Sequence, residues 1–230
     1  MIGIYLVVFN QLEDTKKCLA SLKANTASSY KLVVIDDAST DGTASFLKSQ
    51  GYQVIENKQR TSQSYRNNQG LKYFLNDPDL EYIVAIHNDM TFYPNWLDRL
   101  VDHYNFDSNI GKLSADSYHQ YGKNDPVAAV NFMQLHQYQY RDGNGGPWIM
   151  SRRVIEKVGL FDEQYIGCGG YEDWDYNNRV KQLGYLVMIT KGSVVLHLGM
   201  GTRKNLNTIM EAQNNALVYH KKWNTFNEQI

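Results

Sequence analysis

Short hydrophobic runs alternate with longer amphipathic segments through the first half of the chain. The runs, which are typical of strands, occupy 2–9, 31–35, 52–55 and 82–86, and the segments between them, which are typical of helices, occupy 13–23, 43–50 and 61–75. Strands that alternate with helices predict βαβ units and a largely parallel sheet. Ligands of such sheets bind beyond the carboxyl ends of the strands. We therefore expect the functional residues directly after each run, at 10–11, Asp36, Asp37, Asn57 and 87–90.

The second half of the chain is less regular. Its pattern predicts helices over 95–104, 152–158, 171–183 and 206–223, and strands over 112–116, 185–189 and 194–198. Residues 127–140 are rich in aromatic side chains and are expected to be extended, with a glycine-rich turn after them. The sequence contains no repeat and no linker-like stretch. It predicts one α/β domain over 1–230, with a single mixed, mostly parallel sheet flanked by helices.

Composition excludes several classes of protein. The 23 Lys and Arg against 24 Asp and Glu give a formal net charge of −1, which argues against a general nucleic-acid or anionic-membrane binder. Cys18 and Cys168 are too few for a disulfide framework and lack metal-ligand spacing, so both are expected to be thiols. The opening hydrophobic run is too short for a signal peptide or a membrane span, and no later run reaches the necessary length. We expect a cytoplasmic protein.

The strand over 31–35 ends in two carboxylates, Asp36 and Asp37, which are the first candidates for ligand binding. Ser39 is expected to cap the helix that follows. Such a turn presents a carboxylate to the donors of a ligand, although Asp and Ser also shape turns that have no function. The pairing of the two aspartates favours ligand contact.

The strand over 82–86 ends in His87, Asn88 and Asp89, which places oxygen and nitrogen ligands at the same edge of the sheet. A diphosphate needs a compensating charge there. Because the chain lacks a G-x-x-x-x-G-K-[ST] phosphate loop, a divalent ion held by a carboxylate is the available substitute. Asn and Asp are also common turn residues. A lone histidine on a hydrophobic strand is usually structural, but pairing with Asp89 makes His197 a candidate metal ligand.

Residues 167–175 place a glycine-rich stretch before a helix with three carboxylates in its first turn. The helix dipole stabilises acidic side chains there by roughly 0.3–1 kcal/mol each, and Asp175 forms an i,i+4 pair with Arg179. Glu172 and Asp173 are adjacent and point about 100° apart around the helix. One of them can hold the structure while the other meets a substrate.

Aromatic-rich clefts suit sugar rings or bases, and two tryptophans are candidates for stacking on a substrate, because an indole offers a large flat face. These are Trp148 and Trp174, for which core packing is the alternative reading.

Taken in order, these segments resemble the family 2 glycosyltransferases, a group with the GT-A fold that transfers sugars from nucleotide-diphosphate donors. The likeness extends over nearly the whole chain. It rests on VVIDDASTDGT at 33–43, QSYRNNQGL at 63–71, GGPWIMSRRVIEKVGLFDE at 145–163 and YEDWDYNNRVKQLGY at 171–185. Residues 86–89 stand in the place of the DxD-type metal motif, with His87 and Asn88 where acidic residues are common. Residues 169–175 are also similar to the Gly-Gly-Glu-Asp segment of β-galactosyltransferase relatives.

The resemblance implies a role for residues on the donor side. Asp37, or Asp36 beside it, would contact uracil or another base, and the backbone of Phe9 and Asn10 would line the base pocket. Arg66 would lie near the nucleotide.

The resemblance also implies the residues of the reacting centre. Asn88 would face the ribose or the diphosphate, while Asp89 and His197 would bind Mn²⁺ or Mg²⁺. Asp173, next to Glu172, would be the general base that activates the acceptor hydroxyl.

The implied reaction is an inverting, metal-dependent transfer of one sugar, from a UDP-sugar by preference, to a glycan, lipid-linked or protein acceptor. Residues 1–90 would bind the nucleotide-sugar, and 91–230 would bind the acceptor and carry the catalytic residues. The chain lacks the QxxRW-like motif and the membrane helices associated with processive synthases, which favours a single transfer. Near-neutral charge argues against a nucleic-acid acceptor. The segment 214–224 is expected either to cover the cleft or to pack on a partner subunit of a homo-oligomer.

Two alternatives remain at this point. A sugar nucleotidyltransferase also uses a nucleotide-binding α/β sheet and a metal, but its glycine-rich, basic phosphate loop near the N-terminus is absent from this sequence. A non-catalytic carbohydrate-binding relative would keep the fold and lose the chemistry, and the His87-Asn88 pair is the feature in its favour.

Overall fold

The computed structural model describes residues 1–117, 125–197 and 208–224. The helices of these residues are α1 (Leu12–Asn25), α2 (Thr43–Ser49), α3 (Gln63–Leu75), α4 (Trp96–Phe106), α5 (Pro126–Leu135), α6 (Arg152–Val158), α7 (Glu172–Gln182) and α8 (Ile209–Trp223). The strands are β1 (Ile2–Val8), β2 (Tyr30–Asp36), β3 (Gln53–Glu56), β4 (Tyr82–His87), β5 (Met90–Phe92), β6 (Ile110–Ser117), β7 (Tyr140–Asp142), β8 (Trp148–Ser151) and β9 (Leu186–His197).

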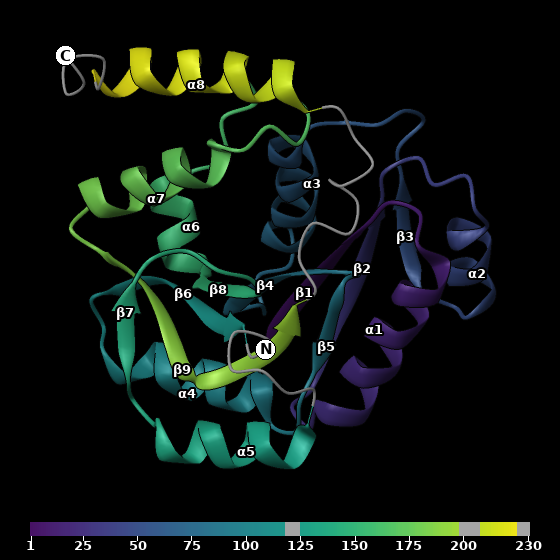
Figure 1. Cartoon of the computed structure of the whole chain (residues 1–230), viewed down its shortest axis with the longest axis vertical. Coiled ribbons are helices and arrows are strands. Elements are labelled where there is room, and N and C mark those ends of the chain that lie inside the picture. The colour runs from purple at the N-terminus through teal and green to yellow at the C-terminus, as the bar shows by residue number, and fades with distance from the viewer. Residues whose placement is uncertain (118–124, 198–207, 225–230) are drawn as a thin grey trace.

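The described strands form one nine-stranded sheet in the order β3-β2-β1-β4-β8-β6-β9-β5, with β7 paired to β9. The strands β1 to β4 are parallel to one another. The remaining pairs are antiparallel, except that β6 runs parallel to β9. Helices cover both faces of the sheet (Figure 1). The expected α/β architecture, with a single mixed sheet between helices, is confirmed.

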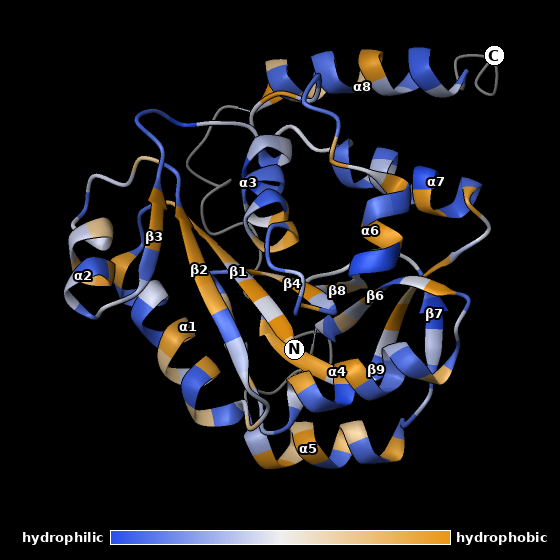
Figure 2. Ribbon diagram, turned by 180° about the vertical axis from the view of Figure 1, so that it is seen from behind, coloured by the Kyte–Doolittle hydropathy of each residue, from blue (hydrophilic) through white to orange (hydrophobic). Residues whose placement is uncertain are grey.

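Two hydrophobic cores lie on opposite faces of the sheet. The first packs side chains of α1, α2 and α4 against one face, and the second packs α3, α6 and α7 against the other. Strand β1 supplies both cores, since Ile4 and Leu6 face the first while Tyr5 and Val7 face the second. Burial on both faces explains why the parallel strands are continuous hydrophobic runs in the sequence. Figure 2 shows these strands as hydrophobic ribbons between helices with mixed surfaces.

The register of the sheet brings the polar ends of separate strands together. Val8 of β1 lies beside Asp36 of β2, and Val7 lies beside His87 of β4. In the second half of the sheet, the pairing of Met90 with His197 places the turn that holds Asp89 next to the end of β9. The polar residues after the hydrophobic runs therefore share one edge, as the alternation of strands and helices predicted.

Two local predictions are wrong. Much of 127–140 is helical, because Asp125 caps the helix with hydrogen bonds from the N–H groups of Val127 and Ala128, and Pro126 occupies the first turn. Ser39 does not cap α2, since Gly42 stands at that position, and Asp41 accepts the N–H of Thr43 at 3.1 Å.

Several strands of the second half also differ from the prediction. The strands expected over 185–189 and 194–198 are one continuous strand, β9, with an irregular register against β6 between Ala115 and Asp116. Strand β8 was not predicted, because its four residues follow a glycine-rich stretch and resemble the end of a turn. Leu198, Leu206 and Asn207 lie outside the described residues.

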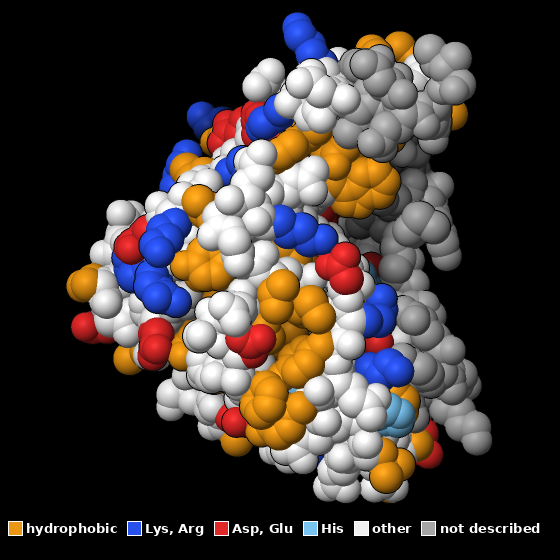
Figure 3. Space-filling view, turned by 90° about the vertical axis from the view of Figure 1, so that its left-hand side faces the viewer, with side chains coloured by type: hydrophobic (Ala, Val, Ile, Leu, Met, Phe, Trp, Pro, Cys, Tyr) orange, Lys and Arg blue, Asp and Glu red, His pale blue; other side chains and the backbone are white. Residues whose placement is uncertain are grey.

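The surface of the described residues carries charges of both signs. On the face seen in Figure 3, Lys and Arg side chains are interspersed with Asp, Glu and hydrophobic ones. This agrees with the near-zero net charge. None of the described helices is long and apolar enough to span a membrane.

Candidate active site

A cavity of about 490 Å³ lies at the carboxyl ends of β1, β4 and β6. Many of the predicted site residues line it together, although they are distant in the sequence: Phe9, Arg66, Asn88, Asp89, Trp148, Glu172, Asp173 and His197. Four predicted residues do not line it, namely Asn10, Asp36, Asp37 and Trp174. The cavity thus joins the predicted metal ligands to the predicted base, whereas the two aspartates at the end of β2 do not line it.

Asn10 connects the turns that follow β1 and β2. It is in the left-handed region with a φ of 53°, and its N–H donates to Ser39 Oγ at 2.8 Å. Its side-chain oxygen accepts the N–H of Thr40 at 2.8 Å. The amide of Asn88 in turn donates to the Asn10 carbonyl and to Thr15 Oγ1, both at 3.0 Å. Asn10 and Asn88 therefore fix the shape of the cavity wall on this side.

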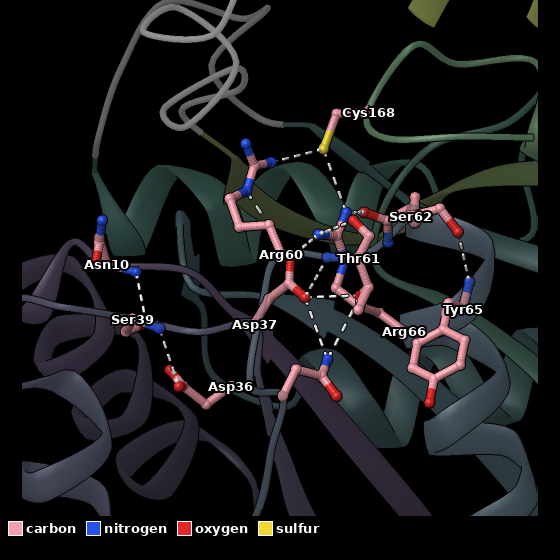
Figure 4. Close-up of polar contacts among 12 residues, drawn as sticks. Asn10, Asp36, Asp37, Ser39, Arg60, Thr61, Ser62, Tyr65, Arg66 and Cys168 are labelled. Atoms are coloured by element: carbon pink, nitrogen blue, oxygen red, sulfur yellow. Dashed lines mark hydrogen bonds and ion pairs between the residues drawn. The ribbon is translucent and has the colours of Figure 1, made fainter.

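Asp37 is fully buried, and protein donors contact both oxygens of its carboxylate (Figure 4). The N–H and hydroxyl of Thr61 donate to it at 2.9 and 2.7 Å, and Asn57 Nδ2 donates at 3.2 Å. The Arg66 guanidinium forms an ion pair with the other carboxylate oxygen. In this arrangement Asp37 sets the orientation of Arg66, and Arg66 rather than Asp37 lines the cavity.

Asp36 is also buried, and one of its oxygens accepts the N–H of Ser39 at 3.1 Å. The other oxygen has no hydrogen-bond partner among the described residues. Burial raises the pKa of Asp36, although the hydrogen bonds from Ser39 act in the opposite direction.

Two arginines that share one hydrogen-bond acceptor line the cavity, although the sequence indicated only one. Arg66 and Arg60 donate to Cys168 Sγ at 3.3 and 3.4 Å, and the Arg60 guanidinium lies 4.5 Å above the centre of the Phe9 ring. Burial opposes the charge of Arg66, but Cys168 and Asp37 together hold its pKa above the ordinary value. The sequence offers no signal for Arg60, because it lies in a connection and its partner is about a hundred residues away.

Asp89 and His197 form the expected pair at the centre of the cavity. His197 Nε2 lies 3.3 Å from Asp89 Oδ1. Burial acts to raise the pKa of Asp89, but the hydrogen bond and charge of His197 more than offset this, and the net pKa is lowered. Burial also lowers the pKa of His87, which keeps that imidazole neutral near pH 7. The carboxylate of Asp89 is therefore ionised, as a metal ligand must be.

The donor set of this pair fits a divalent ion. A carboxylate and an imidazole suit Mn²⁺, and the carboxylate also suits Mg²⁺. Among the described residues, no group of three or more His, Cys, Asp or Glu side chains is arranged to hold a metal. The protein would thus supply two ligands, and substrate oxygens and water would complete the coordination.

Glu172 and Asp173 begin α7 and both line the cavity. Tyr171 caps the helix in the left-handed region with a φ of 72°. Glu172 is buried, whereas the Asp173 side chain is 37% exposed and lies 3.6 Å from Lys112 Nζ. The two adjacent carboxylates thus have different environments, and Asp173 is the more exposed of the two.

The two candidate tryptophans occupy different environments. Trp148 is buried and packs edge-on against Tyr5, with Lys112 Nζ 5.2 Å from its ring centre. It lines the cavity as part of the core. Trp174 is 55% exposed and contacts Tyr171 and Tyr219 outside the cavity.

Helix α8 holds the loop that leads into α7. Asn215 makes three hydrogen bonds with the backbone of Ile166 and Gly170, and Glu211 Oε2 accepts the N–H of Cys168 at 2.7 Å. The sequence left open what this segment covers. In the structure α8 packs on the loop that carries Cys168 and leads into the start of α7.

The sequence matches the family described as Glycosyl transferase family 2 over residues 4–159, which is more than half of the chain. The match includes Asp89 and ends before Asp173 and His197. The chain is also 22% identical over 189 residues to an uncharacterized glycosyltransferase of Rickettsia conorii. That alignment covers 76% of this chain but only 30% of the relative.

Solved structures with a similar fold are glycosyltransferases. The mannosyltransferase PcManGT from Pyrobaculum calidifontis, in complex with GDP-Man and Mn²⁺, has a TM-score of 0.71 and 16% identity, over 97% of this chain and 64% of that chain. GalNAc-T7 with UDP, GalNAc and Mn²⁺ has a TM-score of 0.65 and 15% identity, over 86% and 43%. S. aureus TarS has a TM-score of 0.64 and 12% identity, over 98% and 73%. At these identities the likeness establishes the GT-A fold.

Proposed function

The chain belongs to glycosyl transferase family 2, and from that premise we propose that it transfers one sugar from a nucleotide-diphosphate donor to an acceptor hydroxyl. The observation that carries the proposal is the meeting of three groups in one cavity. These are the arginines of the donor side, the Asp89 and His197 pair, and the Asp173 carboxylate at the start of α7. We propose that 1–90 supply most of the donor site and 91–230 the acceptor site and the base.

The donor side supports a nucleotide diphosphate. Arg60 and Arg66 are cations on the wall of the cavity, and Phe9 offers an aromatic surface beside them. We favour a UDP-sugar on the family resemblance, with Asp37 acting through Arg66. The complex of GalNAc-T7 with UDP and that of PcManGT with GDP-Man make a uridine and a guanosine donor the two to compare first.

Asp89 and His197 are the residues that would hold Mn²⁺ or Mg²⁺. When bound, such an ion supplies a Lewis acid that offsets the negative charge developing on the departing diphosphate. Asp89 brings an ionised carboxylate to this position, and Asn88 beside it holds the Asn10 turn in place.

Asp173 is the proposed general base. An acceptor hydroxyl attacks poorly until its proton is removed, and a positioned base contributes typically about 10²–10⁴-fold. Attack from the face opposite the nucleotide inverts the anomeric carbon and requires one base, which agrees with a single accessible carboxylate at this position. Buried Glu172 is proposed to support the start of α7 rather than to accept the proton.

Thermal stabilisation by nucleotide sugars, with and without Mn²⁺, tests the donor and metal parts of the proposal. We expect a UDP-sugar with Mn²⁺ to raise the melting temperature more than either alone. Binding that never leads to transfer or to donor hydrolysis would instead identify a non-catalytic relative, and release of diphosphate from a nucleoside triphosphate and a sugar phosphate would identify a nucleotidyltransferase.

The Asp173→Asn variant tests the base. It is expected to lower transfer by at least about 10²-fold, the lower end of what such a base contributes, while leaving donor binding unchanged. Asp14→Asn is the matched control, because the Asp14 side chain on α1 is also 37% exposed and does not line the cavity. Normal turnover in Asp173→Asn would exclude Asp173 as the base.

A further inference from the structure

A lysine is buried at the centre of the sheet, behind the cavity. Lys112 lies in β6, its side chain is 0% exposed, and it does not line the cavity. Lysine is almost never fully buried unless it is paired. Replacing such a buried charge by a hydrophobic side chain of the same volume is often neutral or even stabilising. Lys112 therefore needs an explanation beyond the stability of the fold.

The ammonium group of Lys112 has three acceptors for its three N–H donors. Asn144 Oδ1 and Asn177 Oδ1 each accept at 2.9 Å, and Asp173 Oδ1 forms an ion pair at 3.6 Å. The rings of Trp148 and Tyr176 lie 5.2 and 5.9 Å from the same nitrogen. Burial lowers the pKa of Lys112, and the charges of Asp173 and Glu172 oppose this.

Two of these acceptors lie on the same face of α7. Asp173 and Asn177 are four residues apart in that helix, so their side chains are neighbours on its surface. A single ammonium that contacts both fixes the rotation of the first turns of α7 about the helix axis. It also draws the Asp173 carboxylate toward the sheet, on the side where it borders the cavity.

We propose that Lys112 is the positioning residue for Asp173, holding the carboxylate where an acceptor hydroxyl can reach it. This inference rests on the proposed function of Asp173 as the base. Lys112 lies behind the cavity wall, so it acts on the reaction only through Asp173. It is not a catalytic residue, because neither donor nor acceptor can touch it from the cavity.

The closing experiment uses Lys112→Met, which keeps the length of the side chain and removes its charge, in the full chain. A misplacement of about 1 Å costs about 10²-fold in rate, so we expect kcat for transfer to fall by roughly 10- to 100-fold while the KM for the donor stays unchanged. Lys181→Met is the matched control. Lys181 is on the same helix, is exposed and pairs with Asp142 at 3.0 Å, and its removal is expected to leave kcat unchanged.

A double-mutant cycle separates positioning from general damage to the fold. If Lys112 acts through Asp173, adding Lys112→Met to Asp173→Asn leaves the residual rate unchanged, because the carboxylate that it positions is already gone. An equal loss in both backgrounds, or a rise in donor KM without a fall in kcat, would overturn the proposal. If Lys112→Met does not fold, Asn177→Ala takes its place, and a smaller loss of kcat in the same direction is expected.

Carboxyl labelling with a carbodiimide, read by mass spectrometry, does not depend on any sugar transfer. Lys112→Met is expected to increase labelling of Asp173 several-fold and to leave Asp14 unchanged. Equal labelling of Asp173 in both proteins would overturn the inference, whatever the activity. Absence of transfer by the unmodified protein, together with increased labelling in the variant, would overturn the proposed function and leave the contact with Lys112 established.

Discussion

Asn215 is the residue whose removal best tests how α8 supports the candidate active site. It is fully buried on α8. The N–H of Ile166 donates to its side-chain oxygen at 2.9 Å, and its Nδ2 donates to the carbonyls of Ile166 and Gly170 at 3.0 Å. The loop that these bonds hold continues into Tyr171, the cap of α7. Asn215→Ala would remove all three bonds without adding any new contact.

The size of the effect follows from the three bonds. Each neutral hydrogen bond contributes about 0.5–1.5 kcal/mol net, so Asn215→Ala should weaken the docking of the loop on α8 by about 3 kcal/mol. Since every 1.4 kcal/mol is a factor of ten, opening of the loop should become about 100-fold more frequent. The amide of Cys168 is the best reporter, because it bonds to Glu211 and not to Asn215.

Hydrogen exchange of the Cys168 amide measures this opening directly. We expect it to exchange about 100-fold faster in Asn215→Ala, together with a lower kcat for transfer, because Asp173 follows the same loop. Gln213→Ala is the matched control, since Gln213 is exposed on the same helix. Unchanged exchange at Cys168 in Asn215→Ala would show that α8 does not hold the loop and would refute the reasoning.

Three further substitutions have expected outcomes. Asp37→Ala leaves the buried Arg66 guanidinium without its carboxylate and should lower the free energy of unfolding by about 3–5 kcal/mol. Urea denaturation measures this free energy. A loss below about 1 kcal/mol, which is typical of a surface ion pair, would contradict the prediction. His197→Ala removes one of the two proposed metal ligands, so the additional rise in melting temperature that Mn²⁺ produces with the donor should disappear. If that rise is retained, His197 is not a metal ligand. Gly192→Ala would place a Cβ 1.8 Å from His103 Cε1 and should destabilise the fold by about 1–3 kcal/mol, whereas an unchanged melting temperature would mean that His103 moves freely.

The sequence predicted what depends on local pattern. Buried parallel strands are continuous hydrophobic runs, and the residues after them, such as Asp89, meet at one edge because strand polarity requires it. The helix over 126–135 carries two opposing signals in the sequence. Asp125 and Pro126 indicate a helix start, whereas the aromatic and hydrophobic content of the segment is typical of a strand.

What the sequence could not predict depends on contacts between distant segments. Arg60 gains its position only through Cys168 and Phe9. Lys112 alternates with Ser114 and Asp116 along β6, and this pattern alone cannot distinguish a buried ammonium from an exposed one. The fully engaged carboxylate of Asp37 likewise depends on Thr61 and Arg66, which belong to a later connection and helix.

The contact of α8 with the rest of the domain should depend on pH. Lys222 Nζ lies 2.6 Å from Asp162 and 2.8 Å from Asp175. Burial acts to raise the pKa of Asp162, but the hydrogen bond and charge of Lys222 together with the hydrogen bonds from Gln164 outweigh it, and the net pKa is lowered. Burial acts to lower the pKa of Lys222, and the two carboxylates more than reverse this, so its net pKa is raised.

The signs of these two shifts define the pH range in which the contact is stable. A carboxyl with a lowered pKa in the folded state stabilises it above its unfolded value of about 3.9, and the stabilisation is lost as the pH falls through the folded pKa. A lysine with a raised pKa stabilises the fold below about 10.4, and this is lost as the pH rises through the folded pKa. Lys222→Met removes the cation and leaves two carboxylates facing each other, so the difference in melting temperature from the unmodified protein should be largest between about pH 4 and pH 10 and should shrink at both ends. Lys221→Met, a change at the exposed neighbouring residue, should show no such pH-dependent difference. A difference for Lys222→Met that stays constant across the whole range would mean that the ion pairs contribute nothing to the docking of α8, and that the hydrogen bonds of Asn215 and Glu211 hold the loop before α7 without them.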